Sequence, residues 1–180
     1  SMMAVGKVGL IALGTGLVAG AGALTKMAVD TANLAEQLTN LATSTGLTVE
    51  QLQIYRQLSD EMGTSFEGLT STTMVFQRKL IELKEGTGDA SEAFQQLGVS
   101  ITGSDGQMRS MSELFPEIIS KLQGIGNESE RNAIASKLFG RNIKDLTPIL
   151  SMSSSELAKY TAELKKSGTI MSNDAVAKAM

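Results

Sequence analysis

Residues 45–63, TGLTVEQLQIYRQLSDEMG, carry the signals that set the fold class. Thr48 followed three residues later by Gln51 is a capping box, which starts a helix by satisfying free backbone groups of the first turn. Apolar residues then recur at helical spacing, namely Leu52, Tyr55, Leu58 and Met62. Gly63 follows as a stop, because glycine readily takes the left-handed conformation that ends helices. The stretch therefore predicts one amphipathic helix with a defined start and end.

Similar signals for the start and end of helices occur on both sides of this stretch. On the N-terminal side, Leu34, Leu38 and Leu41 predict a long helix that ends at Gly46. On the C-terminal side, caps and glycine stops predict helices near 65–86, 89–98, 110–124, 127–140, 143–150 and 153–168. Pro116 is expected in the first turn of its helix, where a missing N–H is harmless. We expect a mainly α fold, a bundle of about seven or eight helices with coiled-coil-like seams.

One segment between the helices has the pattern of strands. Apolar and polar residues alternate through Val99–Ile101, a turn signal follows at Ser104–Gly106, and Met108 resumes the apolar pattern. Asp followed by Gly is typical of two-residue hairpin turns. The sequence therefore predicts one small β-hairpin near 99–108.

The composition excludes several kinds of site. The chain of 180 residues has no cysteine and no histidine, which removes disulfides, thiolate zinc sites and histidine-based acid–base catalysis. Its formal net charge is −3 and its basic residues are scattered, which argues against sequence-specific nucleic-acid binding. We therefore expect no enzyme activity, no cofactor and no metal site.

Some groups of polar residues resemble catalytic or metal-binding arrangements, but a structural role explains them better. Three carboxylate pairs, Asp60 with Glu61, Glu82 with Glu85, and Glu128 with Glu130, are each local to one predicted helix. A glycosidase needs two carboxylates across a cleft, so solvated helix faces explain these pairs better. The serines of residues 153–155 predict a helix cap, and residues 104–106 lack the further ligands of a calcium loop.

The N-terminal segment is hydrophobic and rich in glycine. Eighteen uncharged residues, Val8–Thr25, lie between Lys7 and Lys26. Within them, Gly16 and Gly20 have the small-xxx-small spacing that lets two helices approach closely. Packing against other copies or a neighbouring helix, membrane insertion, and a secretory signal all remain open.

The ends of the chain suggest an excised piece. A serine precedes Met2, as in a cloning scar, and the helix expected from Ser172 reaches no stop signal by Met180. We divide the chain into a glycine- and alanine-rich hydrophobic helix, residues 1–29, and a helical domain, residues 30–180, truncated at its C-terminus.

Three stretches, in this order, resemble the helical region of tail tape measure proteins from siphovirus-type phages and prophages. They are Asp30–Leu38 with Thr45–Gln53; Ala93–Ser100 with Asp105–Arg109; and Leu138–Asn142 with Leu146–Leu150 and Gly168–Ser172. Together they cover roughly residues 30–180. The family usually has glycine where this chain has Ile143, which affects one local turn.

The resemblance implies a structural role inside the phage tail. Tape measure proteins are long helical polypeptides whose extent sets tail length, and they leave the tube before the DNA. The implied partners are the tail tube protein, tail assembly chaperones and other copies of the chain, in the tail interior of the virion and, during assembly, in the host cytoplasm. The alternative is a membrane-active module, in which residues 8–25 enter the host envelope and assist DNA passage.

Overall fold

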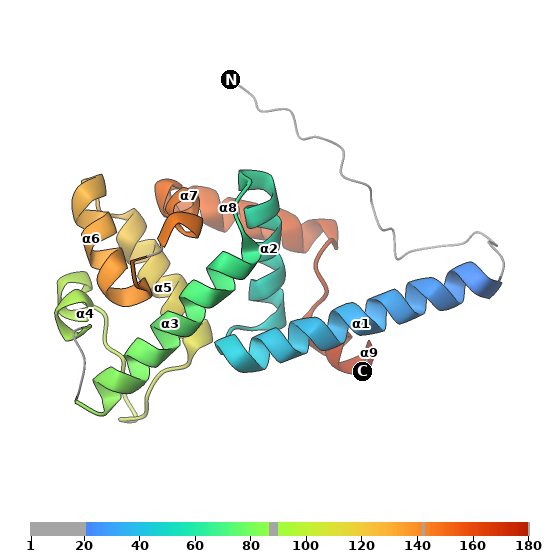
Figure 1. Ribbon diagram of the computed structural model, residues 1–180, viewed down its shortest axis with the longest axis horizontal. Helices are drawn as coiled ribbons and strands as arrows, with labels where there is room; N and C mark the ends of the chain where they lie inside the picture. The colour runs from blue at the N-terminus through green and yellow to red at the C-terminus, as the bar shows by residue number, and fades with distance from the viewer. Residues whose placement is uncertain (1–20, 87–89, 142, 180) are drawn as a thin grey trace, which may run out of the picture.

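The computed structural model describes residues 21–86, 90–141 and 143–179, and these are overwhelmingly helical (Figure 1). The elements are α1 (Ala21–Thr45), α2 (Val49–Met62), α3 (Phe66–Lys84), α4 (Ser91–Leu97), α5 (Met111–Gln123), α6 (Glu128–Phe139), the 3-10 helix η1 (Ile143–Asp145), α7 (Thr147–Ser151), α8 (Ser154–Ser167) and α9 (Asn173–Ala179). The mainly α class is confirmed. The described part of the chain has nine α-helices where about seven or eight were expected, and the last of them, α9, corresponds to the helix expected from Ser172.

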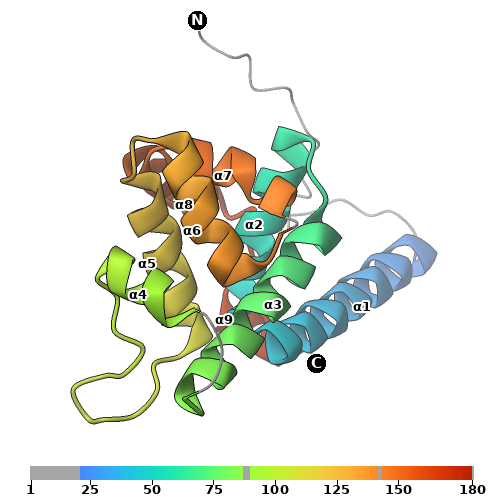
Figure 2. The same cartoon turned by 60° about the vertical axis from the view of Figure 1, so that its left-hand side comes forward.

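The helices form a body from which α1 projects. Figures 1 and 2 both show the C-terminal part of α1 against the body and its N-terminal part extending away from it. The residues of α1 that reach the body include Ala35 and Leu38, which are buried. Helices α2, α3 and α9 pack against α1. The expected long N-terminal helix is therefore present, running without a break from Ala21 to Thr45.

Local signals explain where the helices begin and end. The capping box at Thr48 is formed, with the Gln51 N–H donating to the Thr48 hydroxyl at 3.1 Å and the Thr48 N–H donating to Gln51 Oε1 at 2.9 Å. Gly63 ends α2 with φ at 67°, in the left-handed region that favours glycine. Ser65 and Asn127 also accept an N–H from the third residue of their helices. These boundaries follow from the sequence as expected.

Aromatic rings from five helices meet at the centre of the body. Phe76 of α3, Phe115 of α5 and Phe139 of α6 are almost completely buried. The Phe76 and Phe139 ring centroids are 5.0 Å apart, and those of Phe115 and Phe139 are 5.7 Å apart. Tyr55 of α2 and Phe94 of α4 complete this aromatic cluster. Five of the seven aromatic residues of the chain therefore lie where these helices meet.

The predicted β-hairpin near 99–108 is wrong. No strand occurs in the described residues, and an isolated antiparallel bridge between Thr102 and Met108 stands in its place. Two backbone bonds of 2.8 Å cross this loop, one on each side of the bridge, and the pairing extends no further. On one side of this segment α4 ends at Gly98, and on the other side α5 starts after Ser110. Too little chain remains for two strands.

Candidate functional site

The predicted packing residues Gly16 and Gly20 lie outside the described residues. The same is true of most of the hydrophobic segment of residues 8–25. Among the helices that the structure does describe, none has the length and hydropathy needed to cross a bilayer.

The carboxylate pairs remain local to single helices. Asp60 and Glu61 are exposed in the last turn of α2. Glu82 forms ion pairs along α3, at 3.8 Å with Arg78 and 3.5 Å with Lys79. In the described residues, no group of three or more acidic side chains is placed to hold a metal ion.

The serine run caps α8, as the sequence predicts. The Ser153 hydroxyl accepts the Glu156 N–H at 3.2 Å, and the Glu156 carboxylate accepts the Ser153 N–H at 2.8 Å. The Ser153 hydroxyl also donates to this carboxylate, at 2.8 Å. The backbone N–H and the hydroxyl of Ser153 together hold the pKa of Glu156 below its usual range. Ser153 therefore organises a helix start.

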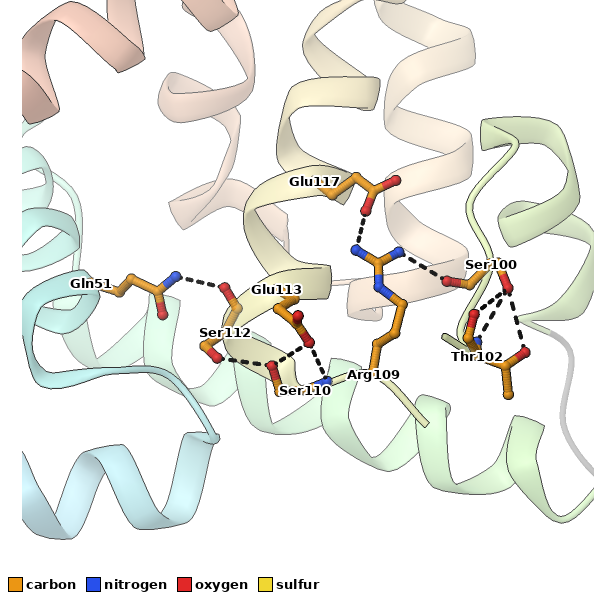
Figure 3. Close-up of polar contacts among 8 residues, drawn as sticks. All are labelled: Gln51, Ser100, Thr102, Arg109, Ser110, Ser112, Glu113 and Glu117. Carbon is orange, nitrogen blue, oxygen red and sulfur yellow. Dashed lines mark hydrogen bonds and ion pairs between the residues drawn. The ribbon is translucent and has the colours of Figure 1, made fainter. Parts of the chain in front are cut away.

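Arg109 ties the loop before α5 to that helix (Figure 3). Its guanidinium donates to the Ser100 carbonyl at 3.1 Å and pairs with the Glu117 carboxylate. Next to it, Glu113 accepts the Ser110 hydroxyl at 2.8 Å and the Ser110 N–H at 3.0 Å. These two bonds, and more weakly the charge of Arg109, lower the pKa of Glu113. The network fixes the loop that replaces the expected hairpin.

Pro116 lies one turn later in α5 than expected, and Gln51 compensates for it. As the sixth residue of the helix, Pro116 has no N–H to donate to the carbonyl of Ser112, four residues earlier. The Gln51 side-chain amide donates to that carbonyl instead, at 2.7 Å (Figure 3). Gln51 thus joins α2 to α5 while it completes the capping box of α2.

Asp145 is a buried carboxylate that the sequence analysis did not single out. The residue is only 5% exposed, and its Oδ1 accepts the Ser65 N–H at 3.2 Å at the start of α3. A helix N-terminus stabilises negative charge, which explains how the carboxylate can be buried there. The nearby Gly68 leaves room for it, since a Cβ atom at that position would overlap Asp145 Oδ2. No local pattern links residues so far apart in sequence.

A groove of about 630 Å³ runs between α2, α5 and α8. Ile54, Tyr55 and Pro116 are among its apolar lining, and its charged lining residues, Glu50 and Lys165, pair with each other at 3.1 Å. This ion pair connects the first turn of α2 with the last turn of α8. The groove is suited to packing and hydrogen bonding.

A family model described as "Phage-related minor tail protein" matches residues 17–140. The match covers more than half of the chain and ends just after α6. No curated protein and no solved structure matches the chain.

Proposed function

The chain belongs to the phage-related minor tail protein family, and from this premise we propose that it is a segment of a tail tape measure protein. Its role as a structural, virion-associated tail protein follows from the family. The finer assignment is supported by the order of the three resembling stretches, which extends beyond the matched region to residue 172.

The observation that carries the proposal is the family match over a body built from helices, with a 25-residue helix projecting from it. An α-helix rises about 1.5 Å per residue, so the length of a helical polypeptide is set by its residue count. A protein of this kind acts as a ruler without any reaction at a site.

We also propose that this chain is not an enzyme. The charged lining residues of the groove between α2, α5 and α8 form an ion pair with each other. The partly buried Gln51 and the buried Asp145 are engaged in helix caps and helix junctions. These groups support the fold.

The proposed partners are those of a tape measure: the tail tube protein, the tail assembly chaperones and further copies of the chain. The proposed location is the tail interior, after a period in the host cytoplasm during assembly. Co-purification of the chain with tail tube subunits from assembling tails tests the first of these contacts.

The decisive experiment changes the number of residues without breaking the fold. Tandem duplication of residues 21–180 in the parent phage is expected to lengthen tails, by about 1.5 Å per added residue where the addition is extended helix. Electron microscopy of purified tails measures the change. An increase in tail length that is smaller than about 1.5 Å per added residue but still proportional to the number of added residues means that the body stays folded inside the tail. Tails of unchanged length would rule out the proposal.

A control separates the number of residues from the stability of the body. Phe115→Ala opens a cavity in the aromatic cluster and leaves the residue count unchanged. Tails assembled from this variant should keep the parental length. A length change in this variant would indicate that folding, and not chain length, determines the tail.

The second candidate function is membrane activity, favoured by the uncharged run of residues 8–25. We propose that any such activity resides in this run. Deletion of residues 1–28 should then abolish association with liposomes in a flotation assay while circular dichroism shows the helices of the body intact. Equal flotation of both chains would exclude it.

A further inference from the structure

Helix α8 is held to the body more weakly than its neighbours. None of its residues is buried, whereas α5, of similar length, buries Met111, Leu114, Phe115, Ile118, Ile119 and Leu122. The apolar side of α8, formed by Leu157, Tyr160 and Leu164, is only partly buried against the core. Little apolar area therefore holds α8 in place.

Hollows flank α8 along its length. The groove of about 630 Å³ separates it from α2 and α5, and a hollow of about 490 Å³ lies beside it at α7. A third, of about 300 Å³, lies where Leu164 approaches α1 and α2. All three hollows are open to solvent, so the side chains of α8 that face them meet water in place of packed neighbours.

Buried side chains and hydrogen bonds hold the segments on either side of α8 to the body. Before it, Ile149 and Leu150 of α7 are buried, and the Gln123 amide donates to the Ile149 carbonyl at 2.8 Å. After it, the Gln53 amide group makes two bonds of 2.9 Å with the N–H and the carbonyl of Met171. The anchors hold the ends while the helix between them is loosely packed.

The contacts within α8 do not depend on the body. Ser153 and Glu156 cap its start and Gly168 ends it in the left-handed conformation. Its ion pair with the body, Lys165 to Glu50, involves a lysine side chain that is 53% exposed, and such exposed pairs stabilise little. An isolated helix of 14 residues is marginal in water. Once released from the body, α8 would therefore unfold. Because an unfolded chain spans more length per residue than a helix, the contacts that hold α7 and Met171 to the body can persist while α8 is unfolded.

We propose that α8 is a strap that opens by local unfolding while α2 to α7 stay folded, and that its opening uncovers the groove at Ile54 and Tyr55. Local unfolding draws on segments with few buried apolar contacts, as seen here. The strap also lies beyond residue 140, where the match to the tail protein family ends. Its opening does not depend on whether the chain measures tail length.

Native-state hydrogen exchange of the intact chain tests the strap directly. The amides of α8 should exchange together, with protection factors lower than those of α5 by about 100-fold or more. Equal protection of α8 and α5 would show that the body opens as one unit and would overturn the proposal.

Filling the groove from the α8 side gives the converse test. Ala158 and Ala162 line the groove and are exposed, so Ala158→Leu and Ala162→Leu place additional apolar atoms in the groove. Exchange of the α8 amides should slow by about 5- to 30-fold, with that of α5 unchanged.

Lys166→Leu is the matched control, because Lys166 is exposed on α8 and lines none of the three hollows. It should leave α8 exchange unchanged. In the Ala158→Leu and Ala162→Leu variants, amide exchange that slows by the same factor in α8 and α5 would contradict the strap. Amide exchange that does not slow at all would contradict it as well.

Discussion

Gly68 occupies the first turn of α3, where an added Cβ atom would overlap the buried Asp145 carboxylate. Gly68→Ala is therefore expected to lower the free energy of unfolding by about 1–3 kcal/mol through overpacking. Urea denaturation followed by circular dichroism measures the loss. Gly126→Ala serves as a control, because a Cβ atom there meets nothing within 4 Å.

A double-mutant cycle assigns the cause. Asp145→Ala removes the carboxylate that obstructs position 68, along with its bond to the Ser65 N–H. In the Asp145→Ala background, Gly68→Ala should be close to neutral, giving a coupling energy between the two positions. An unchanged penalty in both backgrounds would locate the effect in helix α3 itself.

Gln51 provides a second prediction at the scale of single residues. Gln51→Ala leaves the Ser112 carbonyl without its donor and opens the capping box at Thr48. We expect a loss of about 1–3 kcal/mol, since a partly buried acceptor loses its bond together with a cap. Urea denaturation again measures it.

Pro116→Ala tests the compensation by Gln51. An alanine at this position supplies the N–H that α5 lacks, so the Ser112 carbonyl no longer needs the Gln51 amide. The Gln51→Ala penalty should then shrink to that of the cap alone. Additive effects of the two substitutions would refute the compensation.

At the scale of elements, the start of α5 should respond to acid. Hydrogen bonds from Ser110 lower the pKa of Glu113 in the folded chain. The stabilisation is therefore fully present above the usual carboxyl pKa of 4.5 and is lost as the pH falls through the lowered folded value. Urea midpoints recorded from pH 7 to pH 3 should fall less for Glu113→Gln than for the parent chain, because the amide does not titrate.

Glu36→Gln is the control for this series, because Glu36 is an exposed residue within α1. Its pH profile should match that of the parent. A Glu113→Gln profile that also coincides with the parent at every pH would show that the bonds to Ser110 do not discriminate between the protonation states.

Helix boundaries were predictable from the sequence because their causes are local. Thr48 with Gln51, and Ser153 with Glu156, lie within one turn and form the expected capping boxes. The hairpin was predicted wrongly because its alternating pattern is also local, whereas its outcome depends on Arg109 and on the neighbouring helices. The contacts of Gln51 and Asp145 were missed because they join segments 61 and 80 residues apart.

At the scale of the whole molecule, the core is completed after the region that matches the family. The match ends at residue 140, whereas Ile143, Leu146, Ile149 and Leu150 are all buried in the same hydrophobic core. Asp145, which caps α3, also lies in this later segment. Beyond residue 152, Val176 is the buried core residue in the part of the chain for which burial is described. The minimal folding unit should therefore end between α7 and α8.

Two truncations distinguish this boundary from the end of the family match. A chain ending at Met152 should keep a cooperative unfolding transition, since it retains the aromatic cluster and the buried side chains of α7. A chain ending at Gly140 should lose it, because the core and the start of α3 are then exposed to water. Circular dichroism during urea denaturation compares them. Cooperative unfolding of the shorter chain would mean that the matched region folds by itself and that η1 and α7 only cover it.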